Sequence, residues 1–133
     1  MTAAVPRRQE GVTIEFLDSF AAAFNRHDLD AILAHMTDDV RFDVSVGPER
    51  WGRRHEGKAQ VRQGIAEVFA AVPDGRWEEA VHFIAGDRGV SEWVFRGTAP
   101  DGSRIEVNGC DVFTFRDGKI AVKDSYRKGR AFY

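Results

Sequence analysis

The sequence predicts an α+β fold, in which three N-terminal helices pack on a curved, mostly antiparallel sheet and form a conical α+β barrel with an internal pocket. Two observations predict it. Helical spacing of apolar residues dominates the first half of the chain, and alternating apolar runs joined by turns dominate the second half. In addition, Asp117-Gly118 between two alternating runs is a strong hairpin signal. A length of 133 residues suits a single domain over 1–133, with 1–10 expected to be loose.

Three segments carry the helical spacing. Residues 12–25 place apolar side chains three and four positions apart, which is typical of one buried helix face. Asp28 is a good N-cap for a short second helix, whose apolar residues extend to Met36. A third helix is predicted over residues 58–72, and a Pro-Asp-Gly turn ends it.

The remaining segments read as strands and loops. Residues 40–46 alternate between apolar and polar side chains, which indicates a strand. A loop rich in Gly, Pro and Arg is expected over residues 47–57. Further strands are predicted over 76–85, 89–98 and 104–116, followed by the last strand after the Asp-Gly turn. Helices followed by hairpins give the α+β order.

The register of the last hairpin supplies the best functional clue. If the turn has two residues, Phe113 faces Val122, and Asp111 faces Asp124 on the same apolar side of the sheet. Carboxylates on an apolar face are costly unless they are paired or protonated. We therefore expect Asp111 and Asp124 to share a proton as an acid–base pair in the pocket, with Phe113 beside them. A one-residue bulge would separate the pair by moving one strand to the other face.

Other side chains are candidates for the pocket wall. Tyr126 follows Asp124 on the same face, and Trp93 lies on the strand over 89–98, where core packing is the default role of an aromatic residue. Trp51 and His55 lie in the loop before the third helix, where they are expected at the pocket rim, unless His55 is an ordinary exposed histidine. Asp43 alternates away from its apolar neighbours and is expected to face solvent.

Composition excludes several classes of function. The net charge of −2 does not favour binding to nucleic acid or to an anionic membrane. The lone Cys110 cannot form an intramolecular disulfide, and no apolar run resembles a secretory signal or a transmembrane segment, so a cytoplasmic protein is expected. No metal-ligand spacing and no Gly-rich phosphate loop are present, so neither a metal nor another cofactor is expected.

Several segments resemble the nuclear transport factor 2-like superfamily, and within it the SnoaL-like polyketide cyclases and ketosteroid isomerases. The resemblance rests on residues 20–30, 36–40 and 109–120, and on Gly57 at the start of the third helix, and it covers nearly the whole chain. It implies the conical α+β fold. The superfamily includes isomerases, cyclases, epoxide hydrolases, enzyme subunits and non-catalytic binders, so it implies activity only broadly.

The ketosteroid isomerase branch matches at one catalytic position. Asp111 lies where that branch has a protonated aspartate that donates a hydrogen bond to the substrate oxygen. Phe20 lies where it has a tyrosine, and Val44 lies where it has the general-base aspartate. The resemblance therefore implies a pocket that includes Phe20, without that branch's mechanism.

Three functions follow from these observations. The first is a cofactor-independent isomerase, cyclase or dehydratase that acts on an apolar carbonyl-bearing molecule, with Asp111 and Asp124 as acid and base. The second is a non-catalytic domain that binds a small ligand in the same pocket. The third is a partner subunit that uses the outer sheet face. A homodimer through that face is expected from the habit of the resembled family and from the partly apolar Cys110, Val112 and Thr114.

Overall fold

The computed structural model describes residues 11–129, so the segment 1–10 that was expected to be loose lies outside it. Three helices are present: α1 (Ile14–Asn25), α2 (Leu29–Ala34) and α3 (Lys58–Ala71). The strands are β1 (Met36–Glu49), β2 (Gly52–Glu56), β3 (Arg76–Ala85), β4 (Arg88–Thr98), β5 (Arg104–Arg116) and β6 (Lys119–Arg127). The predicted helices and the strand over 104–116 are confirmed to within about two residues at each end.

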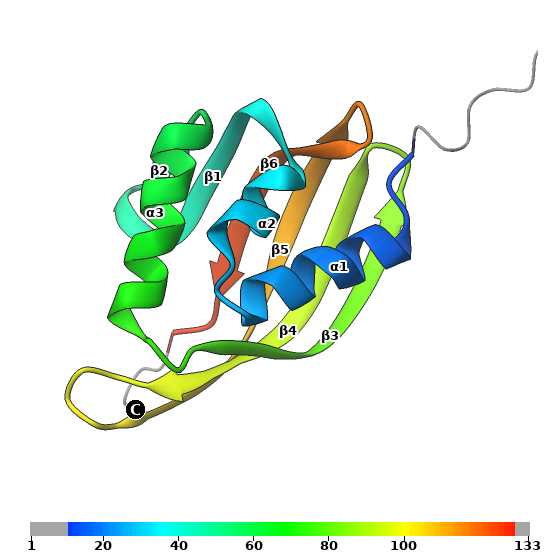
Figure 1. Ribbon diagram of the computed structural model, residues 1–133. Helices are drawn as coiled ribbons and strands as arrows, with labels where there is room; N and C mark the ends of the chain where they lie inside the picture. Colours follow the sequence, from blue (N-terminus) through cyan, green and yellow to red (C-terminus); the bar gives the residue numbers. More distant parts are fainter. Residues whose placement is uncertain (1–10, 130–133) are drawn as a thin grey trace, which may run out of the picture.

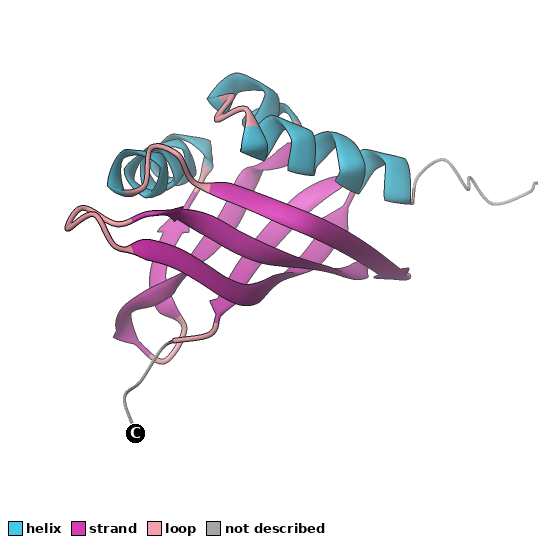
Figure 2. Cartoon of the chain, turned by 90° about the horizontal axis from the view of Figure 1, so that it is seen from below, coloured by secondary structure: helices cyan, strands magenta, loops and turns pink. Residues whose placement is uncertain are grey.

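The strands form one sheet in the order β2-β1-β6-β5-β4-β3. All neighbouring pairs are antiparallel except β1 and β6, which are parallel. The sheet curves, and all three helices lie on its concave face (Figures 1 and 2). The predicted α+β fold is confirmed, with β2 and β3 as the two edges of an open sheet.

Local capping and apolar burial hold the helices in place. The Thr13 side chain accepts a hydrogen bond from the Phe16 amide at the start of α1, and Asp28 accepts one from the Ala31 amide at the start of α2, as predicted. The buried faces of the three helices meet the inner face of the sheet in one apolar core. The largest fully buried apolar side chains of this core include Leu17, Ile32, Met36, Ile65, Phe113 and Ile120.

Strand β2 occupies part of the segment predicted as a loop. Its residues are mostly charged and carry no apolar alternation, because an edge strand needs only backbone pairing on one side. Gly52 permits the turn into this strand. Its φ is +84°, and a Cβ there would lie 1.8 Å from the carbonyl oxygen of Val44.

The turn between β5 and β6 is the predicted one. Asp117 and Gly118 both have positive φ, 55° and 73°, as a type I′ turn requires. Phe115 pairs with Ile120, which confirms the register next to the turn. The ladder then shifts by one residue between Thr114 and Phe115.

This bulge changes every pair beyond it. Phe113 faces Lys123 instead of Val122, and Asp111 faces Ser125 instead of Asp124. The predicted Asp111–Asp124 pair is therefore wrong, because Asp111 points to the inner face and Asp124 to the outer face. The sequence-based register was chosen so that Phe113 would not face Lys123. In the structure Lys123 is accommodated on this apolar face because it pairs there with the buried Asp111.

Candidate functional site

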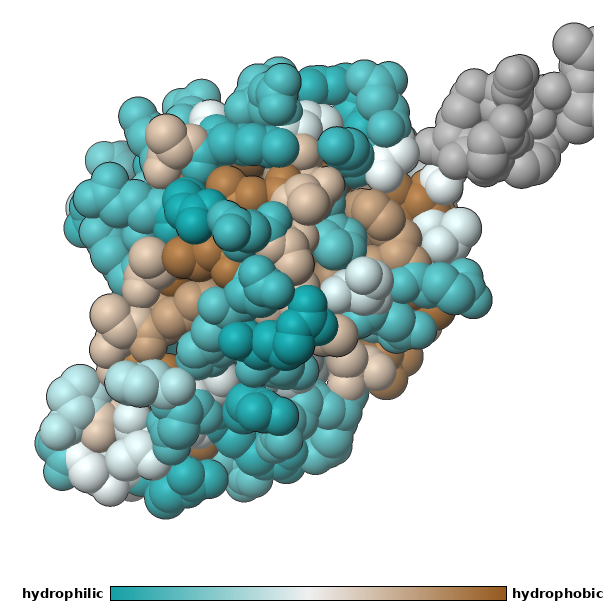
Figure 3. All heavy atoms as spheres, in the orientation of Figure 1, coloured by the Kyte–Doolittle hydropathy of each residue, from teal (hydrophilic) through white to brown (hydrophobic). Residues whose placement is uncertain are grey.

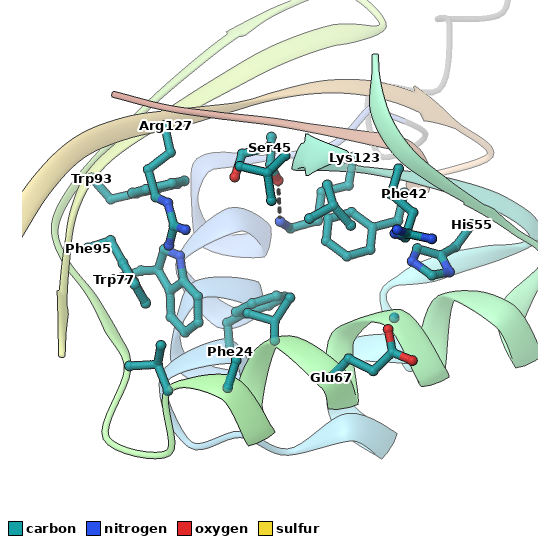
Figure 4. Close-up of a pocket in the computed structure, with 18 residues that line it drawn as sticks. Phe24, Phe42, Ser45, His55, Glu67, Trp77, Trp93, Phe95, Lys123 and Arg127 are labelled. Carbon is teal, nitrogen blue, oxygen red and sulfur yellow. Dashed lines mark hydrogen bonds between the residues drawn. The ribbon is translucent and has the colours of Figure 1, made fainter. Parts of the chain in front are cut away.

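A cavity of about 250 Å³ lies over the inner face of the sheet, next to α3. On the side of the molecule that carries the helices, apolar side chains show between polar ones (Figure 3). Aromatic side chains from both layers form much of the cavity wall (Figure 4). They are Phe24, Phe42, Trp77, Trp93 and Phe95. The cavity is therefore suited to an apolar, planar ligand.

A buried hydrogen-bond network lies at the base of this wall. The Lys123 ammonium donates to Asp111 Oδ1 at 2.9 Å and to Ser125 Oγ at 2.9 Å. Ser125 Oγ also donates to Asp111 Oδ1 at 2.6 Å, and Trp93 Nε1 donates to Asp111 Oδ2 at 3.1 Å. The side chains of Lys123 and Asp111 are 4% and 8% exposed. Buried charges of this kind are tolerated because they are paired and hydrogen-bonded. We call these four residues the Asp111 network.

The network presents the Lys123 ammonium, rather than a carboxylate, to the cavity as a donor, because the single Ser125 hydroxyl hydrogen is already donated to Asp111. Lys123 and Ser125 line the cavity, whereas Asp111 lines a much smaller hollow beneath it, together with Phe20 and Phe113. Asp111 receives hydrogen bonds from an ammonium, a hydroxyl and an indole N–H, so its role here is that of an acceptor. It does not take the hydrogen-bond-donating role that the ketosteroid isomerase resemblance implied.

Two aromatic rings complete the surroundings of the ammonium. Lys123 Nζ lies 4.7 Å from the ring centroids of both Phe24 and Phe42. Cations over aromatic faces are stabilised by the ring quadrupole. The ammonium is thus fixed between a helix and a strand, with its position set from several sides.

Other ionisable side chains line the cavity farther from the network. His55 of β2 stacks on Phe42, with ring centroids 6.1 Å apart. Its Nε2 is buried without a hydrogen-bond partner, and the ring packs against Gly64 of α3, where a Cβ would lie 2.6 Å from it. Glu67 and Arg127 also line the cavity, and Figure 4 shows Glu67 on the α3 side of it.

Asp124 belongs to a different site. A hollow on the outer face of the sheet contains Asp124, Tyr126 and Trp51. The Tyr126 hydroxyl donates to Asp124 Oδ2 at 3.1 Å. Burial raises the pKa of the Asp124 carboxyl, the Tyr126 hydrogen bond opposes that shift, and the nearby Asp43 charge adds to it.

Asp43 departs from its predicted exposure. It does lie on the outer face, but it is 1% exposed, because Arg54 covers it. The Arg54 guanidinium donates to both Asp43 carboxylate oxygens, at 2.8 and 3.0 Å. This bidentate pair joins β2 to β1 and helps to explain why a charged segment forms a strand.

The sequence-based candidates therefore fall into three places. Trp93 and His55 line the cavity, as expected for pocket residues. Phe20 and Phe113 lie beneath it, and Tyr126, Trp51 and Asp124 lie on the outer face. Sequence reasoning missed three cavity residues of β6, namely Lys123, Ser125 and Arg127. The sequence shows that these residues alternate along one strand. Only the bulge between β5 and β6, which the sequence does not show, places them on the inner face.

Metal ligands and membrane-spanning helices also bear on function. Within residues 11–129, no three side chains of His, Cys, Asp or Glu gather closely enough to hold a metal ion. No helix in the same part of the chain is long and apolar enough to cross a membrane.

Comparison with known proteins assigns this architecture to a family. The SnoaL-like domain matches residues 17–123, which include most of α1, all of α2 and α3, most of the cavity wall, and Trp93, Asp111 and Lys123 of the network. The chain belongs to the SnoaL-like family. A search of curated proteins found no match to this SnoaL-like chain.

Solved structures support the SnoaL-like assignment. A protein of Xanthomonas campestris pv. campestris, provisionally named a polyketide cyclase, is 26% identical, with a TM-score of 0.74 over 84% of this chain and 87% of that one. TerC, co-crystallized with polyporic acid, is 25% identical, with a TM-score of 0.73 over 86% and 90%. A protein of Pseudomonas putida KT2440, also provisionally named a polyketide cyclase, is 24% identical, with a TM-score of 0.76 over 86% and 90%.

Proposed function

We propose that this SnoaL-like protein is a small, cofactor-independent enzyme that moves protons next to the carbonyl group of an apolar molecule bound in the interior cavity. One observation carries the proposal. A lysine ammonium is fixed at the base of an aromatic cavity by a serine hydroxyl and by a buried carboxylate outside the cavity lining, and these two hydrogen bonds leave one of its three N–H groups for a ligand. A fixed cationic donor in an apolar site is suited to stabilise a developing oxyanion.

The chemistry follows from the position of this donor. When a proton leaves the carbon next to a carbonyl group, the electron pair moves to the oxygen and forms an enolate. The remaining N–H of the Lys123 ammonium would donate to that oxygen, and Asp111 and Ser125 keep the ammonium in place. Removal of one such donor costs about 3 kcal/mol of transition-state stabilisation in characterised enzymes.

His55 is the best candidate for the proton acceptor. It lines the cavity, and imidazole is the side chain that most often serves as a general acid or base. Because Nε2 packs against Gly64, Nδ1 is the nitrogen left to serve a ligand. His55 would take the proton from carbon and return it at another carbon in an isomerisation, or to a leaving hydroxide in a dehydration.

The relatives support this class of reaction. The Xanthomonas protein carries the provisional name of a polyketide cyclase, and TerC was crystallized with polyporic acid. Cyclisation of a polyketide by aldol chemistry also begins with loss of a proton beside a carbonyl group. We therefore place isomerisation, cyclisation and dehydration together, since all three begin with the same enolate.

Exchange of α-protons in D₂O tests the proposal. We expect the protein to accelerate deuterium incorporation into β-tetralone, a bicyclic apolar ketone, as followed by NMR. The variants His55→Gln and Lys123→Met should lose this acceleration, whereas Asp124→Asn, on the outer face, should retain it. Retained acceleration in His55→Gln would reject His55 as the base, and loss in Asp124→Asn would reject the assignment to the interior cavity.

Non-catalytic binding in the same cavity is the second candidate. It is favoured by the completeness of the Asp111 network, in which both carboxylate oxygens already have donors. Binding of β-tetralone without accelerated exchange would support this alternative.

We also propose that the protein forms a homodimer through the outer face of the sheet. Val81, Phe83 and Tyr126 lie on that face and are 51%, 55% and 54% exposed. Large exposed apolar side chains that gather on one face are typical of an interface.

A further inference from the structure

Strand β6 carries a row of polar side chains along one wall of the cavity. Lys123, Ser125 and Arg127 alternate along the strand, and all three line the cavity. From the rise per residue of an extended strand, the Cα atoms of the first and last are about 13 Å apart. The row therefore offers an ammonium, a hydroxyl and a guanidinium at successive positions along a bound molecule.

The two cations differ in their partners. Lys123 is paired with the Asp111 carboxylate at 2.9 Å. The Arg127 guanidinium lies 4.6 Å from the centroid of the Phe95 ring, and no ion pair joins it to any carboxylate among residues 11–129. Desolvation lowers the pKa of Arg127, although the residue stays exposed to solvent at the end of β6.

The charges that line the cavity are unequal. Arg53, Lys123 and Arg127 line it with positive charge, and Glu67 is the acidic residue among the described lining residues. Figure 4 shows Arg127 beside Trp93 and Trp77 at one end, with Glu67 toward the other end. Counting Asp111 against Lys123, the Arg127 end of the cavity has an exposed positive charge without an ion pair among residues 11–129, although Arg127 also lines an outer groove that contains Glu79 and Glu92.

We propose that the molecule bound in the cavity is an acid, an aromatic carbonyl compound whose carboxylate pairs with Arg127. The proposal deepens the proposed function and rests on it for the location of the ligand. An anion at this end would restore the charge balance, and the guanidinium can hold a carboxylate through two parallel hydrogen bonds. The aromatic body would lie against Trp77, Trp93 and Phe95.

Calorimetry with a matched pair of ligands tests this inference. β-Naphthoate and β-naphthamide share one aromatic body and differ in charge. We expect the wild-type protein to bind the naphthoate about tenfold more tightly, the size of one charge-assisted hydrogen bond at a partly exposed site. Arg127→Gln should abolish the preference while affinity for the amide stays unchanged.

Two further variants control the experiment. Arg127→Met keeps an apolar side chain over Phe95 but removes the charge. It should lose the preference for the naphthoate as Arg127→Gln does, which would show that the preference depends on the charge and not on packing against Phe95. Lys128→Gln removes the adjacent charge, which lines an outer groove instead of the cavity, and should keep the preference. Unchanged melting temperatures would show that the variants are folded.

Each other result overturns the inference. Equal affinity for the two ligands in the wild type would reject an acidic ligand and leave the proposed function standing. A preference that survives both Arg127 substitutions would place the anion elsewhere. If neither ligand binds, the location in the cavity fails, and the proposed function fails with it.

Discussion

Lys123 lies opposite Phe113 in the β5–β6 ladder, and its ammonium reaches across to Asp111 at 2.9 Å. This contact exists because one extra residue in β6 turns Lys123 inward. A buried ion pair of this kind contributes less to stability than its geometry suggests, since both charges lose their hydration. Its retention in the wall of a cavity is therefore better explained by a role toward a ligand.

Removal of one partner of this pair should destabilise the protein strongly. Lys123→Met leaves the Asp111 carboxylate buried without its cation, so we expect the free energy of unfolding to fall by about 3–5 kcal/mol. Urea denaturation measures this loss. The double variant Lys123→Met/Asp111→Leu should recover most of it, because no unpaired charge remains. If the double variant loses as much free energy of unfolding as Lys123→Met alone, the pairing of Lys123 with Asp111 is contradicted.

Gly64 tests the position of His55. Alanine is favoured over glycine inside a helix by about 1 kcal/mol, yet a Cβ at Gly64 would lie 2.6 Å from the His55 ring. Gly64→Ala should therefore lower the melting temperature of the wild type. In a His55→Ala background the same substitution should raise it. If Gly64→Ala stabilises the wild-type protein, His55 does not pack on α3 as described.

The Asp124 carboxyl predicts a pH dependence with a definite sign. Folding raises its pKa above the ordinary value of 3.8, chiefly by burial, so the folded chain holds this proton more tightly than the unfolded chain. Its ionisation thus costs stability, and the cost grows as pH rises from 3.8 through the raised pKa. Asp124→Asn should be slightly more stable than the wild type near neutral pH, by less than about 1 kcal/mol.

Thermal unfolding across the acid range measures this effect. The difference between Asp124→Asn and the wild type should vanish below pH 3.8, where both side chains are neutral in the folded and unfolded states. A variant that is less stable than the wild type at neutral pH and equal to it in acid would show a lowered pKa instead, contrary to the account.

The outer face of the sheet predicts the oligomeric state. Val81→Lys with Phe83→Lys places two charges on this exposed apolar surface and should convert a dimer into a monomer in analytical ultracentrifugation. The double variant should keep the melting behaviour of the folded chain, because neither side chain is part of the core. A wild-type chain that is monomeric at tens of micromolar, roughly the range in which weak interfaces dissociate, would argue against this interface.

Much of the fold could be predicted because local signals and apolar patterns agreed. The Asp28 cap and the turn at Asp117-Gly118 both appear as expected. Strand β2 was not predicted, because an edge strand of charged residues carries no apolar alternation. Its contact with β1 includes the ion pair between Arg54 and Asp43, which a hydropathy pattern does not show.

The candidate site was harder to predict for one physical reason. A single unpaired residue near Ala121 reverses the faces of everything after it in β6. The rule that apolar residues oppose one another favoured the straight register, in which Lys123 would face outward. The true register instead pairs Lys123 with Asp111, and a charge-to-charge contact within an apolar face is invisible to a pattern of hydropathy alone.

The three tryptophans of the chain provide the most direct test of the central claim, that ligands bind over the Asp111 network in the interior cavity. Trp77 and Trp93 line that cavity, and Trp51 lines the outer hollow that contains Asp124. The measurement is a titration with β-tetralone followed by proton–nitrogen NMR of the indole N–H groups, each assigned by a Trp→Phe variant. The account predicts that the Trp93 and Trp77 signals shift with one common affinity while the Trp51 signal stays in place. A shift of Trp51 alone, or no shift of any indole signal, would contradict it.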